Sequence, residues 1–69
     1  MNLILNHSPE VIITDQQTLT VAELLKIKTY TFKLLIVKIN DNIVKRDDYA
    51  TSTIKDGDNV QVIHLISGG

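Results

Sequence analysis

The sequence predicts an α+β fold in which one main helix packs on one face of a mixed sheet of about five strands. Ile, Val and Thr make up 23 of the 69 residues, and these β-branched types favour strands. One stretch, from Thr20, has the spacing of a capped helix. The chain is too short for two hydrophobic cores, so we expect residues 1–69 to form a single domain.

Residues 1–14 have the pattern of a β-hairpin. Met1, Leu3 and Leu5 alternate with other residues and define one face of a first strand. The segment His7-Ser8-Pro9 interrupts this pattern, and Pro9 fits a turn or a strand edge because it has no N–H for a ladder. We expect a second strand over residues 10–14.

A helix of two to three turns is expected to begin at Thr20. The segment Thr20-Val21-Ala22-Glu23 matches a capping box, in which Thr20 and Glu23 each bond the backbone N–H of the other. Val21, Leu24 and Leu25 follow at helical spacing and form one apolar face. The β-branched crowding of Thr29-Tyr30-Thr31 ends the helix.

The remainder of the chain predicts three more strands, over residues 33–40, 43–46 and 60–66. Asn40-Asp41-Asn42 and Asp56-Gly57-Asp58 are turn sequences, and Gly57 can adopt a positive φ there. One helical turn is expected over residues 47–50, with acidic residues at its start.

The alternation of the strands also predicts an exposed apolar stripe. We expect the helix to cover one sheet face, made of Leu3, Leu5, Val37, Val60 and Val62. Four aliphatic residues then lie on the opposite face: Ile4, Ile36, Ile63 and Leu65. Such a stripe is a candidate partner interface, and scattered surface aliphatics are the alternative interpretation.

Composition excludes several classes of protein. Seven basic against eight acidic residues leave a net charge of −1, which argues against a nucleic-acid surface. There is no Cys, and the longest apolar run, Leu34–Val37, is far too short to span a membrane. With no signal-peptide pattern, a cytoplasmic location is expected; the plastid stroma is the alternative, because the residue usage is that of an AT-rich genome.

No catalytic or metal-binding residues are predicted. The three serines lack a recognisable base, and His7 and His64 have no metal-ligand spacing. No Gly-rich loop lies between a strand and a helix, so we expect no bound cofactor and no ATP site. The acidic turns could still steer a basic partner.

The C-terminus, Ile66-Ser67-Gly68-Gly69, is the candidate functional segment. Since Gly is about 7% of residues in average proteins, a chance Gly-Gly end occurs about once in 200 chains. Two residues without Cβ make a thin thread that can enter a narrow active site on another protein. A terminal carboxylate becomes reactive when a partner converts it to an acyl-adenylate, so the chain fits a substrate protein rather than an enzyme. A functionless frayed end is the alternative.

These features resemble the ThiS family, the sulfur-carrier proteins of thiamin biosynthesis in the ubiquitin-like β-grasp superfamily. The resemblance covers the chain from Thr18 onwards. It rests on four segments: Thr20–Leu25, Val37–Asn40 with Ile43–Arg46, Tyr49 with Ile54–Val60, and the terminal Gly68–Gly69. The chain departs from the family at Lys45, where Pro is usual, and at Lys28, where an apolar residue is usual. It also departs in the first turn, which is expected at His7-Ser8-Pro9 instead of at a tight Asn-Gly pair.

The resemblance implies a reaction cycle at the end of the chain. An activating enzyme similar to ubiquitin E1 would adenylate the Gly69 carboxylate with ATP and Mg²⁺. Sulfur from a persulfide made by a cysteine desulfurase would then replace AMP, and the Gly69 thiocarboxylate would pass sulfur to thiazole synthase. The stripe of Ile4, Ile36, Ile63 and Leu65 would dock these partners, and Arg46 would pair with a carboxylate of a partner or of its own chain.

The sequence is also compatible with three other functions. The small subunit of molybdopterin synthase shares the fold, the tail and the activation. A ubiquitin-like modifier would instead form isopeptide bonds to lysines on target proteins. A plain β-grasp interaction module would leave the tail idle.

Overall fold

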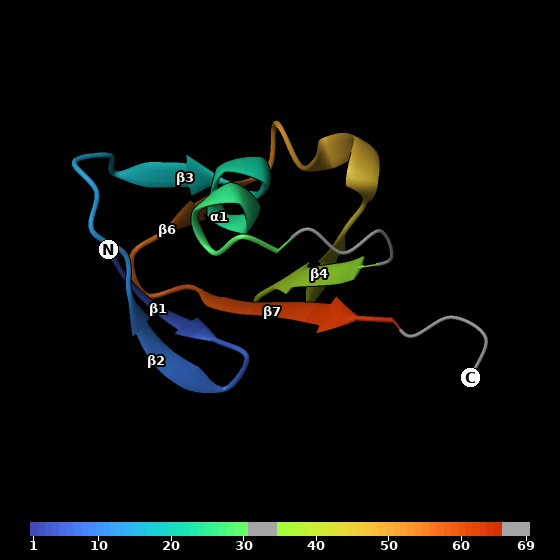
Figure 1. Ribbon diagram of the computed structural model, residues 1–69, viewed down its shortest axis with the longest axis horizontal. Helices are drawn as coiled ribbons and strands as arrows, with labels where there is room; N and C mark the ends of the chain where they lie inside the picture. Colours follow the sequence, from blue (N-terminus) through green and yellow to red (C-terminus); the bar gives the residue numbers. More distant parts are fainter. Residues whose placement is uncertain (31–34, 66–69) are drawn as a thin grey trace.

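A computed structural model describes residues 1–30 and 35–65 of the chain (Figure 1). Its elements are β1 (Asn2–Leu5), β2 (Ser8–Val11), β3 (Thr18–Thr20), α1 (Val21–Ile27), β4 (Leu35–Ile39), β5 (Asn42–Val44), the 3₁₀ helix η1 (Arg46–Asp48), β6 (Thr53–Lys55) and β7 (Asn59–His64). Five strands form one sheet in the order β2-β1-β7-β4-β5, in which β1 and β7 are parallel. The predicted mixed sheet with one main helix on one face is confirmed.

The first hairpin turns two residues earlier than predicted. Asn6 and His7 both have positive φ, 51° and 68°, so they form the turn and Leu5 lies opposite Ser8. Strand β2 therefore begins at Ser8 and ends at Val11, instead of spanning residues 10–14. The sequence did not indicate this turn, because the left-handed conformation is adopted by Asn6 and not by a glycine.

Pro9 lies on β2, the outermost strand of the sheet, opposite Ile4. Met1 and Ile12 exchange two 2.8 Å hydrogen bonds, and bonded pairs alternate along an antiparallel ladder. Residue 9 therefore falls at a position where the backbone nitrogen faces the open edge. The predicted place of Pro9 at a strand edge is confirmed, and its missing N–H removes no bond of the sheet.

Helix α1 begins at the predicted capping box. The Thr20 hydroxyl accepts from the Glu23 N–H at 3.1 Å, and the Glu23 carboxylate accepts from the Thr20 N–H at 2.9 Å. The helix has seven residues, about two turns. It ends in a Schellman-type cap, in which the Tyr30 N–H bonds the Leu25 carbonyl and Thr29 has a φ of 55°.

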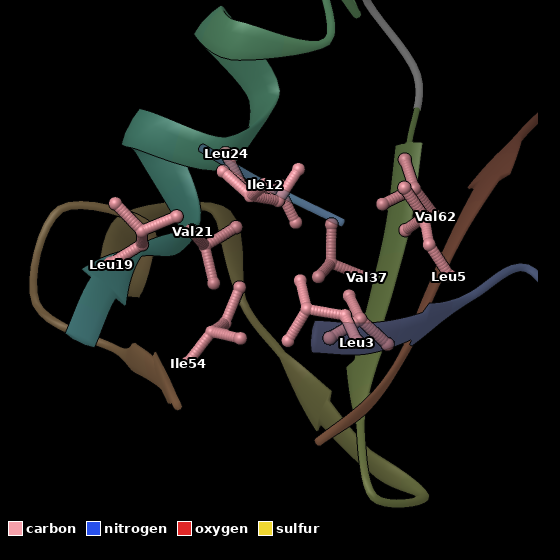
Figure 2. Close-up of a cluster of buried hydrophobic side chains, with 10 residues drawn as sticks. Leu3, Leu5, Ile12, Leu19, Val21, Leu24, Val37, Ile54 and Val62 are labelled. Carbon is pink, nitrogen blue, oxygen red and sulfur yellow. The ribbon is translucent and has the colours of Figure 1, made fainter. Parts of the chain in front are cut away.

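The core lies between the five-stranded sheet and the layer made by α1 with β3 and β6 (Figures 1 and 2). The sheet contributes the five residues predicted to face the helix, and all of them are buried: Leu3, Leu5, Val37, Val60 and Val62. From the other side come Leu19, Val21, Leu24 and Ile54, and Ile12, which directly follows β2, completes the buried cluster. The helix alone is too short to cover the sheet, and the second layer is completed by β3 and β6.

The pairing of β3 with β6 was not predicted. Leu19 lies opposite Ile54 in this two-stranded sheet, and both side chains are buried. Each strand has three residues, too few for a visible alternation. Their pairing brings together segments far apart in the sequence, and it also fixes the start of α1, because the Val21 N–H donates to the Ser52 carbonyl at 3.0 Å.

The boundaries of the later elements shift by one or two residues. Strand β5 begins and ends earlier than the predicted 43–46, which places Arg46 in the helix η1 instead of a strand. Strand β7 ends at His64, so Leu65 follows it and Ile66 lies outside the described residues. Both predicted turns are confirmed: Asn40 and Asp41 have positive φ, and Gly57 has a φ of 89°.

A buried carboxylate joins these two turns. Asp58 is 6% exposed, and its side chain accepts from the Lys55 N–H at 3.0 Å and from the Asn40 amide at 3.1 Å. The side-chain oxygen of Asn40, Oδ1, in turn accepts from the Asn59 N–H at 2.9 Å. The β4–β5 turn is thereby tied to the start of β7.

Candidate functional site

Strand β7 carries the chain toward its C-terminus from the centre of the sheet. It lies between β1 and β4 and pairs with β4 over five residues, from Val60 to His64. The predicted tail, Ile66, Ser67, Gly68 and Gly69, lies outside the described residues. The role of Gly69 as the sulfur-carrying residue therefore stays a prediction.

Three of the four predicted stripe residues lie near the end of β7: Ile36 and Ile63 are on the sheet face away from the helix, and Leu65 directly follows the strand. Ile36 and Ile63 are directly opposite each other across β4 and β7. Ile63 is 40% exposed, Leu65 is 41% exposed, and Ile36 is half-buried. We call these three residues the tail-side patch, because the candidate tail begins immediately after Leu65.

Ile4 does not join this patch. It lies on β1 opposite Asn59, at the start of β7, so most of the length of β7 separates it from Leu65. Between them lies Gln61, whose side-chain nitrogen is 3.1 Å from His7 Nε2. The predicted continuous stripe is thus divided by a polar contact into two parts.

Ile4 instead belongs to a second apolar area at the outer hairpin. A shallow hollow of about 300 Å³ is lined there by Ile4, Pro9 and Val11, with Gly57 at its border. Ile4 is 38% exposed and Val11 is 62% exposed. We call Ile4, Pro9 and Val11 the hairpin patch.

Arg46 is exposed on η1, after the edge strand β5. The tail-side patch lies on β4 and at the end of β7, so Arg46 is carried by a different part of the chain. Its predicted pairing with a partner carboxylate stays a prediction.

The described residues offer no metal centre. No group of three or more His, Asp or Glu side chains among residues 1–30 and 35–65 could hold a metal ion. A hollow of about 590 Å³ lies between β5 and β6, and it is lined largely by hydroxyl and amide side chains such as Asn42, Thr51 and Thr53. The carboxylates of Asp48 and Asp58 also line this hollow.

Two charged groups have shifted pKa values, and both hold helix α1. The backbone N–H of Thr20, with help from the Gln16 side chain, lowers the pKa of Glu23. The hydrogen bond from Lys28 to the Glu10 carboxylate raises the pKa of Lys28 and ties the helix end to β2. Lys28 stands where the resembled family usually has an apolar residue, and here it makes a salt bridge. These shifts belong to the scaffold and not to a reactive site.

The tail-side patch and the contact between His7 and Gln61 depend on the register of the strands. Sequence alternation found the outward residues, but nothing in the sequence indicated that His7 would meet Gln61.

Within the part of the chain that the structure describes, no helix has the length and apolarity needed to cross a membrane.

Comparisons with known proteins agree with this fold. The sequence model of the ThiS family matches residues 4–69. No curated protein matches the chain. A crystal structure of the thiamine biosynthesis protein (ThiS) from Geobacter metallireducens is 31% identical, with a TM-score of 0.84 over the whole of both chains. An NMR structure of a thiamine biosynthesis protein from the same organism is also 31% identical, with a TM-score of 0.78, and the match covers all of this chain and 88% of the other.

The five-stranded mixed sheet with its helix is therefore a ubiquitin-like β-grasp, and the family match takes in almost the whole chain, including Gly68 and Gly69. The chain belongs to the ThiS family.

Proposed function

We propose that this protein carries sulfur for thiazole formation in thiamin biosynthesis, as a thiocarboxylate on Gly69. The observation that carries the proposal is the family match over residues 4–69, because it extends through the Gly-Gly end. The solved relatives, described as thiamine biosynthesis proteins, favour the thiamin branch over the molybdopterin branch. The absence of Cys from the sequence agrees with a sulfur that is carried on the terminal carbonyl group.

The chemistry is done to this chain by partner enzymes. An E1-like enzyme with ATP and Mg²⁺ transfers AMP to the Gly69 carboxylate and releases pyrophosphate. A persulfide sulfur, supplied by a cysteine desulfurase, attacks the acyl carbon and displaces AMP. A thiol then cleaves the S–S bond and leaves the thiocarboxylate, which is the sulfur donor to thiazole synthase.

Mass spectrometry of the intact chain tests this cycle. After incubation with the activating enzyme, ATP, Mg²⁺ and a persulfide donor, we expect a mass gain that corresponds to one oxygen replaced by sulfur. The matched controls are a chain that lacks Gly69 and a chain with one residue added after Gly69, and neither should gain sulfur. A mass gain in either control, or none in the natural chain, would refute the proposal.

The choice of acceptor separates the two branches. The thiocarboxylate form is incubated with thiazole synthase or with the large subunit of molybdopterin synthase, and loss of the thiocarboxylate is followed. We expect sulfur transfer to be supported by thiazole synthase. Transfer supported only by the molybdopterin synthase subunit would place the chain in the other branch.

We also propose that the tail-side patch docks the activating enzyme. It exposes apolar surface next to the segment that must enter the active site, so one contact would position the tail. Ile63→Ser should lower the rate of adenylation about tenfold by weakening binding. Val11→Ser is the matched control: it removes an aliphatic residue from the more exposed hairpin patch and should leave the rate unchanged. Equal rates for both variants would refute the docking role.

A further inference from the structure

The turn between β6 and β7 contains a reactive pair, Asp56 and Gly57. Both residues are exposed, and Gly57 has a φ of 89°. A Cβ atom built on Gly57 would meet no atom within 4 Å, so the site is open to water. Asp followed by Gly is chemically labile, because a residue without Cβ leaves its nitrogen unhindered for attack on the preceding side chain.

The reaction needs no enzyme and no co-reactant other than water. The Gly57 nitrogen loses its proton and forms a bond to Cγ of Asp56, while the carboxyl group loses its hydroxyl, so one water molecule leaves and a succinimide ring forms. Water then adds to either ring carbonyl and reopens it. One opening restores Asp56, and the other gives isoaspartate, in which the main chain runs through the side-chain carbon.

In the folded protein, both reacting groups are held by one residue, Asn2. The Asn2 N–H donates to Asp56 Oδ1 at 2.6 Å, and the Gly57 N–H donates to the Asn2 carbonyl at 2.7 Å. Asn2 is free to make these bonds, because the alternation of the β1–β2 ladder turns its backbone groups away from β2. The two bonds join the turn to the start of β1, far away in sequence.

These contacts oppose the reaction directly. The Gly57 nitrogen must give up its proton before it attacks, but that proton is bonded to the Asn2 carbonyl. A bonded amide releases its proton through local opening, so the reaction depends on the population of the opened turn. We propose that Asp56–Gly57 is an isoaspartate-forming site that the Asn2 contacts hold in check, independently of the sulfur-carrier function.

Isomerisation at Asp56 would disturb the turn between β6 and β7. Isoaspartate adds one main-chain atom between β6 and β7. Two neighbouring hydrogen bonds fix the present length of the turn, so an extra atom cannot be added without breaking contacts. The Asp58 N–H donates to the Lys55 carbonyl at 3.1 Å, and the Ile4 N–H donates to the Asp58 carbonyl at 3.0 Å. The modified turn would therefore lose the Asn2 contacts, and the altered chain would remain more open at this point.

The test compares three states at physiological temperature and neutral pH: the folded chain, the urea-unfolded chain and a peptide of residues 53–60. Isoaspartate at position 56 is measured by electron-transfer fragmentation and by methyl transfer from protein isoaspartyl methyltransferase. We expect the folded chain to react at least about tenfold more slowly than the peptide, which corresponds to about 1.4 kcal/mol of opening free energy. Equal rates in the folded chain and the peptide would overturn the proposal.

Two further experiments test whether the contacts of Asn2 slow isoaspartate formation at Asp56. Asn2→Pro removes the N–H that holds Asp56 and should raise the rate in the folded chain. If this variant does not fold, low urea concentrations that leave the natural chain folded should raise the Gly57 amide exchange rate and the isoaspartate rate together. If the rate of isoaspartate formation does not rise when the exchange rate of the Gly57 amide rises, the protective role of Asn2 is overturned. Asp56→Glu, which cannot form the five-membered ring, should give no isoaspartate at position 56.

Discussion

Asp58 should be among the polar residues on which this fold depends most. Its carboxylate is 6% exposed and accepts from the Lys55 N–H at 3.0 Å and the Asn40 amide at 3.1 Å. Asp58→Ala removes both bonds and leaves two donors without their acceptor. A hydrogen bond to a charged group contributes about 1.5–3 kcal/mol. Because water can reach the exposed Lys55 and Asn40, we take the lower value for each and expect a loss of about 3 kcal/mol.

That loss is large for a chain of this size. A domain of 69 residues has a free energy of unfolding of about 3–10 kcal/mol, so the variant should lose about 30% or more of it. The corresponding fall in Tm is about 12 °C or more. Urea unfolding followed by circular dichroism measures the difference, and Asp58→Asn, which keeps one acceptor oxygen, should lose less.

Asp47→Ala is the matched control for the loss of charge. Asp47 is exposed on η1, and its substitution should change the free energy of unfolding by less than about 0.5 kcal/mol. If Asp58→Ala costs less than about 1 kcal/mol, or no more than this control, then the bonds between the two turns do not stabilise the fold as argued.

Three other predictions concern the ends of helix α1. Thr20→Ala should lower the free energy of unfolding, measured in urea, by about 1 kcal/mol, because it removes the helix cap. Thr18→Ala, on the same strand, should lower it by clearly less. Thr29→Gly should raise the free energy of unfolding by about 0.5 kcal/mol, since the strain of a β-branched residue at a φ of 55° exceeds the added chain entropy of Gly. A lower urea midpoint than that of the natural chain would contradict this. The raised pKa of Lys28 means that its bond to Glu10 stabilises the fold fully below the ordinary value of 10.5 and is lost as pH rises through the higher folded value. Unfolding midpoints from neutral to strongly alkaline pH should therefore fall more for the natural chain than for Glu10→Gln, and parallel curves would rule out this linkage.

The parts of the fold that local chemistry determines could be predicted from the sequence. The alternation of Leu3 with Leu5, and of Val60 with Val62, identified the buried sheet face. The capping box at Thr20 identified the helix start, because both of its bonds lie within four consecutive residues. These signals depend on neighbours in the chain, so they do not require knowledge of the tertiary structure.

The parts that long-range pairing determines could not be predicted. Nothing near Leu19 or Ile54 indicates that they face each other, since their strands have three residues each. The candidate interface shows the same limit. Alternation found that Ile4 and Ile63 point outward, but the parallel register of β1 on β7 sets Ile4 opposite Asn59 and so divides the stripe.

Pro9 limits how copies of this protein can associate through their sheets. Among the described strands, the sheet ends at β2 on one side and at β5 on the other. A strand that approached β2 from outside would find no N–H at position 9, whereas β5 has neither Pro nor a charged residue along its three positions. Two copies that paired through β5 would each present a blocked edge to the solvent. Edge pairing would thus stop at a closed dimer and could not grow into a fibre, which is compatible with the proposed role of the chain end as a sulfur carrier.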